Sequence, residues 1–230
     1  MYTWITTLLR KIISSRAKIK NPIVCADMQS LWRKRSWEIS KKFVNFDYVR
    51  ISSLELVAEE IHQKKIPGNV AELWVYQWYF ASKIQEFFPE KKLYLFDTFE
   101  GFDEKDLHTE TYKKYSDGAK RFEDTNIEIV MKKMKHPHNC IIKKWYFPET
   151  THDIEDTFCF VSIDTDLYEP ILAGLQRFYP RLNHGGYMFI HDYNNSEYKG
   201  AKQAVQKFCH DKNINYFPLS DNRGTVVIVK

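Results

Sequence analysis

Apolar residues follow this chain in short blocks that have two different spacings. From residue 51 they recur every three to four positions, which predicts a helix, and Ser52 and Glu55 are spaced as a capping box at its start. Compact apolar runs then alternate with further segments of helical spacing. The predicted strands are NVAELWV, KKLYLF, FCFVSI and GGYMFI, and the predicted helices carry Phe80, Ile84, Phe87 and Phe88, then Ile171, Leu172, Leu175 and Phe178, then Ala201, Ala204, Val205 and Phe208.

Strands that alternate with helices are typical of a parallel sheet. The C-terminal stretch INYFPLSDNRGTVVIVK is interpreted as two strands around the turn-forming residues 220–224, so an antiparallel pair is expected at the sheet edge. Residues 103–140 are rich in Lys, Asp, Glu and His and are expected to form a long polar excursion over the sheet. The pattern as a whole predicts an α/β fold with one core.

Size and charge support one globular domain and argue against a nucleic-acid partner. With 230 residues, of which 43% are hydrophobic, the chain can bury a sizeable core. Its net charge of +4 comes from 34 basic and 30 acidic residues spread along the sequence, so no nucleic acid is expected to bind. The four cysteines form no CxxC pair, which is typical of reduced thiols and predicts a cytoplasmic protein.

The N-terminal segment, residues 1–49, is basic and amphipathic. Its apolar runs are too short to span a bilayer, and it lacks the order of a signal peptide. A cationic amphipathic helix can rest on a membrane surface or close over a pocket as a lid. We expect packing or a lid, and we place the main domain in residues 50–230. The sequence does not decide the oligomeric state, and it allows a homo-oligomer.

Polar residues follow directly after three of the predicted strands. KLYLF is followed by Asp97, FCFVSI by Asp164, and GGYMFI by His191 and Asp192. In an open α/β sheet, ligands bind at the C-terminal ends of the strands. Carboxylates and an imidazole from adjacent strand ends suit a divalent cation that keeps positions open for substrate. The alternative for Asp164 is a buried acid whose oxygens accept hydrogen bonds from backbone amides.

Two acids have competing interpretations. Asp97 stands where such folds hydrogen-bond a ribose diol, but an Asp at this place can also hold its own loop together through Thr98 and Glu100. The sequence does not decide between these two roles. Asp166 and Glu169 are spaced as a capping box for the following helix, so helix capping is favoured over catalysis for Asp166.

Several blocks stand in order between residues 50 and 210, among them IPGNVAEL, LYLFDTFEGF, FPET, IDTDLYEP and HDYN..EYKGAKQAV. Together they resemble the macrocin O-methyltransferase (TylF) family. The resemblance implies a Rossmann-like class I methyltransferase with a mostly parallel seven-stranded sheet, helices on both faces and a C-terminal antiparallel strand pair. It also implies S-adenosylmethionine, a divalent cation that is usually Mg²⁺, and a sugar hydroxyl as acceptor in surface-polysaccharide or natural-product biosynthesis.

The family pattern implies roles for individual residues of this chain. It implies a metal site at Asp164, His191 and Asp192, with Asp164 or His191 as the catalytic residue that takes the proton of the acceptor hydroxyl. His191 is a departure, because antibiotic-pathway members tend to have two acids before the tyrosine. The implied cofactor-binding residues are Glu72, Trp74, Tyr76, Trp78, Asp97, Thr98 and Trp145.

Tryptophan stands at three positions where the family pattern has glycine, and the whole chain has only 8 glycines. Indoles at these positions would overpack a cofactor site. One hypothesis is therefore a non-catalytic glycan-binding module whose cofactor pocket is blocked by Trp74, Trp78 and Trp145. A second hypothesis is that the three codons are UGA, which some bacteria read as glycine and other genetic codes read as tryptophan, so that the cellular protein carries glycine there.

Overall fold

The computed structural model describes residues 47–230, so the predictions for the N-terminal segment lie almost entirely outside the described residues. Strands of this part form a seven-stranded sheet in the order β3-β2-β1-β4-β5-β7-β6. The strands are β1 (Asn69–Leu73), β2 (Leu93–Asp97), β3 (Cys140–Lys144), β4 (Phe158–Ile163), β5 (Leu182–Ile190), β6 (Phe217–Pro218) and β7 (Val226–Val229). The first five run parallel, and β7 pairs antiparallel with β5 and β6, which confirms the predicted sheet.

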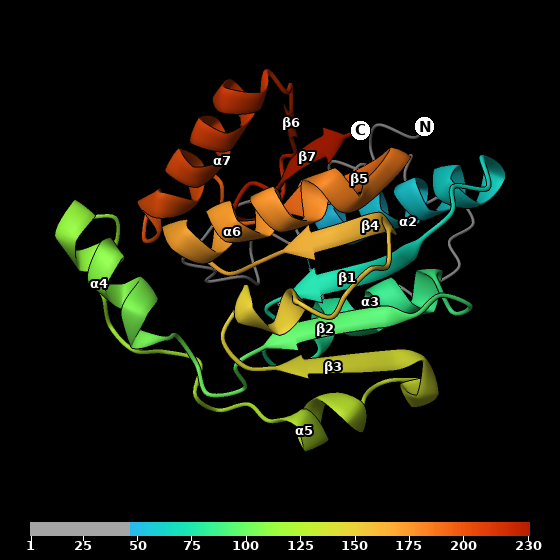
Figure 1. Cartoon of the computed structure of the whole chain (residues 1–230), viewed down its shortest axis with the longest axis horizontal. Helices are drawn as coiled ribbons and strands as arrows, with labels where there is room; N and C mark the ends of the chain where they lie inside the picture. Colours follow the sequence, from blue (N-terminus) through green and yellow to red (C-terminus); the bar gives the residue numbers. More distant parts are fainter. Residues whose placement is uncertain (1–46) are drawn as a thin grey trace, which may run out of the picture. The chain divides into compact units, whose positions relative to one another are not determined.

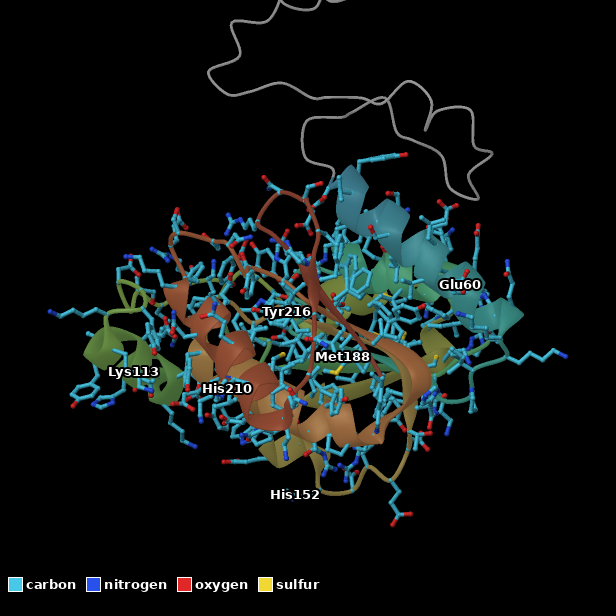
Figure 2. The ribbon with its side chains drawn as sticks, turned by 90° about the horizontal axis from the view of Figure 1, so that it is seen from above. Glu60, Lys113, His152, Met188, His210 and Tyr216 are labelled. Carbon is cyan, nitrogen blue, oxygen red and sulfur yellow. The ribbon has the colours of Figure 1, made fainter. Side chains whose placement is uncertain are left out.

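Helices cover both faces of the sheet. Their bounds are α2 (Tyr48–Gln63), α3 (Tyr79–Phe87), α4 (Glu104–Lys113), α5 (Ile127–Met131), α6 (Tyr168–Phe178) and α7 (Lys199–Lys212), with short 3₁₀ turns η3 (Pro137–Asn139), η4 (Glu149–Thr151) and η5 (Tyr179–Arg181). α6 and α7 lie on one face, and α2 and α3 lie on the other (Figure 1). In Figure 2, Met188 of β5 lies between Glu60 on α2 and His210 on α7. No helix within residues 47–230 is long and apolar enough to cross a membrane.

The larger core lies between the sheet and the helices α6 and α7, and Phe178 of α6 is at its centre. The ring of Phe178 is centred 5.4 Å from that of Phe96, 5.7 Å from that of Phe147 and 5.3 Å from that of Phe158. These rings belong to β2, to the segment after β3, and to β4. Aromatic contacts at such distances stabilise beyond the area that they bury. They hold the strands in a fixed relation, so the strand ends form a rigid edge.

Two features of the fold differ from the sequence-based expectation. β3 was not among the predicted strands, because its apolar residues are few and are followed by lysines, and its side chains at the sheet edge are only half-buried. The polar excursion over residues 103–140 contains α4 and α5. Both helices have an acidic residue in the first turn, which favours helix formation, in α4 despite its low apolar content.

The capping box predicted in the first helix is wrong. α2 begins at Tyr48, and the side chain of Asp47 caps it by accepting a hydrogen bond from the Arg50 amide at 3.1 Å. Ser52 therefore lies inside the helix, where its hydroxyl donates to the carbonyl of Val49. Residue spacing alone cannot separate a cap from an interior pair of the same types.

The capping role predicted for Asp166 is also wrong. α6 begins at Tyr168 with Leu167 as its N-cap, and no side chain of the N-cap residue bonds to the helix. The carboxylate of Glu110, from α4, accepts the Tyr168 amide at 2.8 Å instead. Asp166 is buried, and burial together with the charge of Asp192 raises its pKa well above the usual range. It is therefore part of the acidic cluster described below.

Candidate active site

Polar residues meet at the C-terminal ends of the neighbouring strands β1, β4 and β5. Leu73 is in register with Ile163, and Ile163 is in register with Ile190. The amide of Asp164 bonds to the Leu73 carbonyl at 3.1 Å, and the amide of His191 bonds to the Ile163 carbonyl at 2.9 Å. The arrowheads of β1 and β4 point to the same edge of the sheet (Figure 1). Asp164 and His191 therefore leave the sheet side by side.

The three predicted metal ligands form a tight cluster at this edge. The Nδ1 atom of His191 lies 2.8 Å from Oδ1 of Asp164 and 2.7 Å from Oδ2 of Asp192. One ligand atom from each of the three residues lies within 4.8 Å of the others. Asp192 is buried, whereas Asp164 and His191 are partly exposed. A small ion can therefore reach the cluster from solvent.

Arg50 of α2 belongs to the same cluster and was missed by the sequence analysis. Its Nη1 donates to Oδ2 of Asp164 at 2.8 Å, and its Nη2 donates to the hydroxyl of Ser162 at 3.1 Å. The guanidinium lies 3.7 Å from the centre of the Phe80 ring, and Arg50 is only 6% exposed. Because Arg50 binds Oδ2 of Asp164, the Oδ1 atom of that carboxylate is left to face His191.

The charges of this cluster are strongly coupled. Burial alone would lower the pKa of His191, but the carboxylates of Asp164 and Asp192 outweigh burial and raise it to about 9. Burial opposes the ionisation of Asp164, yet Arg50 and His191 hold its pKa below the usual range. Burial raises the pKa of Glu72 well above the usual range. At neutral pH the imidazole therefore carries a proton between two carboxylates, at a place where a cation can replace that proton.

The residues present fit a divalent cation. They offer carboxylate oxygens and one imidazole nitrogen, and they leave coordination positions for water or substrate. The buried Oε2 of Glu72 has no hydrogen-bond partner among the described residues, and Asp166 adds a further buried acid. Burial raises the pKa of both acids, and a bound cation beside them would favour their ionised forms. The donor set suits Mg²⁺ or a softer metal that accepts imidazole.

Asp97, at the end of β2, holds the loop that follows β1. Its Oδ2 accepts hydrogen bonds from the amides of Val75 and Tyr76, both at 2.8 Å, and its Oδ1 accepts one from the amide of Phe99 at 2.6 Å. The loop-holding role is thus observed, although through other amides than those expected. The carboxylate keeps lone pairs that no described hydrogen bond uses, so ribose binding stays a prediction.

A narrow hollow lies in front of Asp97. Its volume is about 30 Å³, which is room for about two water molecules, whereas cofactor pockets measure roughly 300–1,000 Å³. A wider hollow of about 390 Å³ lies beside it, and Trp145 and Tyr146 line both. Trp145 therefore stands at the junction of the two hollows. The residues around the narrow hollow include Trp74, Asp97, Thr98, Asp106, Trp145 and Tyr146.

Three of the predicted cofactor-binding residues do not line either hollow. The hydroxyl of Tyr76 donates to the carboxylate of Asp124 at 2.9 Å, and the indole of Trp78 lies 5.0 Å from the ammonium of Lys133. Glu72 lies near Arg50, within the acidic cluster. The structure therefore divides the predicted residues between the two hollows, the loop after β1 and the candidate metal site.

Asp106 of α4 is a pocket residue that the sequence analysis missed. It is buried, and its carboxylate accepts a hydrogen bond from the Tyr146 hydroxyl at 2.9 Å. Burial raises the pKa of Asp106 from 3.8 to about 7. The folded state therefore binds this proton more tightly than the unfolded chain does. The ionised carboxylate of Asp106 is less favourable in the folded state than in the unfolded chain. The free energy of unfolding therefore falls as the pH rises from about 4 to 7.

Asp106→Asn is expected to stabilise the protein above pH 7, on the order of 2–4 kcal/mol, because asparagine has no charge to bury. Near pH 4 the variant and the parent are expected to be equally stable. Urea unfolding at several pH values between 4 and 8 measures the difference. Glu104→Gln, an exposed acid on the same helix, serves as the control and is expected to show no such trend. A parallel pH dependence in Asp106→Asn and the parent would contradict the assignment.

Several solved structures with a similar fold are described as methyltransferases. NovP is 18% identical over 79% of each chain, with a TM-score of 0.63. The calicheamicin methyltransferase CalS11 is 18% identical over 78% of each chain, with a TM-score of 0.61. A putative caffeoyl-CoA O-methyltransferase from Staphylococcus aureus is 11% identical over 78% of this chain and 83% of its own, with a TM-score of 0.53. The Rossmann-like methyltransferase fold is thereby confirmed. No curated protein matches the sequence.

The family comparison covers most of the chain. The macrocin-O-methyltransferase (TylF) family matches residues 44–227, a span that includes the cluster around Asp164 and the loops around Asp97. Sequence and fold therefore lead to the same class of enzyme. The chain belongs to the TylF family of macrocin O-methyltransferases, which confirms the resemblance found in its sequence.

Proposed function

We propose that this protein is a cytoplasmic enzyme that uses S-adenosylmethionine and a divalent cation to methylate a sugar hydroxyl, in the biosynthesis of a surface polysaccharide or a natural product. The observation that carries the proposal is the cluster of Asp164, His191 and Asp192 beside the hollow at Asp97. A sugar acceptor is supported by CalS11, which is described as a TDP-rhamnose 3′-O-methyltransferase. The cofactor is supported by TomG from Streptomyces achromogenes, an O-methyltransferase of the same fold solved with S-adenosylmethionine.

In this proposal Asp164, His191 and Asp192 hold the cation, which would lower the pKa of the acceptor hydroxyl. Asp164 or His191 would take the hydroxyl proton, and the cofactor would supply the methyl group, whose bond to sulfur would break as its bond to the acceptor oxygen forms. His191 must first release the proton that it carries at neutral pH, because its pKa is about 9. Asp164 is ionised at neutral pH, but Arg50 and His191 lower its pKa and make it the weaker base of the two.

One observation favours a second candidate function. In the sequence as written, Trp74 and Trp145 leave about 30 Å³ in front of Asp97, which is too little for a cofactor of this size. A non-catalytic glycan-binding module with a blocked cofactor pocket would have this geometry and would keep the acidic edge. It predicts glycan binding without S-adenosylmethionine binding. Micromolar affinity for the cofactor in the protein as written would exclude it.

Methyl transfer to a panel of acceptors distinguishes the two functions. The full-length protein, as written and with glycine at positions 74, 78 and 145, is incubated with methyl-labelled S-adenosylmethionine and with nucleotide-sugars or glycosylated lipids. We expect label transfer by the glycine form with MgCl₂ and none after chelation. Transfer that survives chelation would remove the cation from the proposal. Glycan binding without cofactor binding in both forms would select the module. Membrane contact by residues 1–49 and homo-oligomerisation remain predictions.

A further inference from the structure

The tryptophans of residues 47–230 share an unusual backbone conformation. Their φ angles are 77° at Trp74, 98° at Trp78 and 138° at Trp145. Residues with a side chain tolerate positive φ mainly in the left-handed region, at about +50 to +70°. The other non-glycine residues with positive φ in this part of the chain lie between 49° and 66°, whereas its positive-φ glycines lie between 67° and 107°. All three tryptophans therefore fall outside the range of the side-chain-bearing residues, and two of them fall within that of the glycines.

Hydrogen bonds of the fold impose these conformations. The amide of Trp74 bonds to the Phe96 carbonyl at 2.7 Å, and the amide of Trp145 bonds to the Asp97 carbonyl at 3.1 Å. The amide of Trp78 bonds to the Val75 carbonyl at 3.0 Å, in the turn that leads into α3. Two of these bonds are made to the end of β2, and the third closes the loop that the Asp97 carboxylate holds. The main chain around Asp97 thus requires residues that accept such angles.

The indole side chains make few contacts that could offset the strain of this backbone conformation. Trp145 is 60% exposed, and Trp78 is the N-cap of α3 in a left-handed conformation without a side-chain hydrogen bond to the helix. Trp74 packs on the rings of Phe102 and Phe122, with centres 4.9 Å and 5.8 Å away, and in doing so it narrows the hollow at Asp97. Bulky residues at positive φ are outliers that need a compensating contact. Trp78 contacts the Lys133 ammonium at 5.0 Å and the Tyr79 ring at 6.0 Å, and contacts of this kind each contribute only weakly to stability. Trp145 leaves most of its side chain in solvent.

We infer that the cellular protein carries glycine at positions 74, 78 and 145, and that the three codons are UGA. Glycine adopts all three φ angles without steric cost. Loss of the Trp145 side chain would join the narrow hollow to the wider one, and loss of the Trp74 side chain would open the space in front of Asp97. The assignment of glycine at the three positions is argued from the backbone angles alone. The claim that glycine opens a cofactor pocket rests in addition on the proposed function.

Sequencing of the gene and mass spectrometry of the native protein identify the residues at positions 74, 78 and 145 directly. UGA at the three codons, and glycine-containing peptides across residues 71–83 and 144–148 by mass spectrometry of protein from the source cells, are expected. UGG at these codons, or tryptophan-containing native peptides, would overturn the inference. This test involves no ligand, so it is independent of the methyltransferase proposal.

Matched glycine and alanine variants test the physical argument. Trp145→Gly and Trp145→Ala both remove an exposed indole, but alanine keeps the Cβ atom that conflicts with a φ of 138°. Trp145→Gly is expected to raise the melting temperature by roughly 2–8 °C above both the parent and Trp145→Ala. Equal melting temperatures for the two variants would overturn the backbone argument.

Variants changed at all three positions test the cofactor pocket separately from the identity of the residues at positions 74, 78 and 145. Calorimetry is expected to give micromolar S-adenosylmethionine binding for the triple glycine form, and at least tenfold weaker binding for the triple alanine form and for the protein as written. A triple glycine form that melts higher yet binds no cofactor would keep the residue assignment and overturn the cofactor pocket. Equal cofactor affinity in the glycine, alanine and tryptophan forms would overturn the claim that glycine opens the site.

Discussion

Asp164→Ala and Asp192→Ala are each expected to abolish cation binding and to lower cation-dependent methyl transfer by roughly 10²- to 10³-fold or more. Each substitution removes a carboxylate that lies within 2.8 Å of the Nδ1 atom of His191. Each variant leaves one acid and the imidazole at the site, so the cation would lose one of its two carboxylates, which are the ligands that a hard cation prefers. His191 would also lose one of the two carboxylates that hold its proton, so the charge balance of the cluster would change.

Calorimetry with MgCl₂ or MnCl₂ measures cation binding without any cofactor, and the labelled transfer assay with glycine at positions 74, 78 and 145 measures turnover. Asp164→Asn keeps an oxygen for Arg50 and controls for misfolding. Asp211→Ala, an exposed acid on α7, is expected to behave like the parent in both assays. Full activity of either alanine variant in chelator-treated, magnesium-supplemented assays would contradict the metal assignment.

The candidate ligands were predictable because they follow uninterrupted apolar strands. FCFVSI coincides with β4, and GGYMFI forms the last six of the nine residues of β5. Parallel neighbours in register place their C-terminal ends at one edge, so Asp164 and His191 had to emerge together. The contacts within the cluster could not be predicted in this way, because they depend on side-chain rotamers and burial rather than on position along the chain.

The sequence contained a signal for Arg50 but no information about its partner. Arg50 lies on the same helical face as Leu54, Ala58 and Ile61, which are all buried, and a charged residue on an apolar face indicates a buried ion pair. Its partner Asp164 is 114 residues further along the chain. Only the packing of α2 beside β4 and β5 brings them together. The Glu110 cap of α6 escaped prediction for the same reason, since it comes from a distant helix.

The tryptophans at glycine positions could be recognised from the sequence, but their consequences could not be predicted from it. Their positions in the family pattern were readable from the sequence, but the sequence does not show whether a substitution is tolerated. The answer depends on the φ angle, and 138° at Trp145 is far from any conformation that tryptophan prefers. The backbone angles therefore show that a tryptophan side chain is strained at these positions, and the stability of glycine and alanine variants measures that strain.

Arg50→Met is expected to lower the free energy of unfolding by about 1–3 kcal/mol, because Asp164, which is partly exposed and still faces His191, loses the hydrogen bond from the buried guanidinium. It is also expected to weaken cation binding roughly 10- to 100-fold, the range found for groups that orient a metal ligand from behind. Arg50 acts here as a positioning residue, since its hydrogen bond to Oδ2 fixes the direction of Oδ1 toward His191.

Two further variants separate positioning from charge. Arg50→Lys keeps the positive charge but cannot reach both Asp164 and Ser162 with a planar fork, so its stability and cation affinity should fall between those of the parent and Arg50→Met. Arg223→Met removes a cation that is 44% exposed and 3.6 Å from Asp192, and it should cost less than about 1 kcal/mol. Urea unfolding and calorimetry with MgCl₂ report the two effects separately. If Arg50→Met were as mild as Arg223→Met in both measurements, Arg50 would have no special part in orienting Asp164.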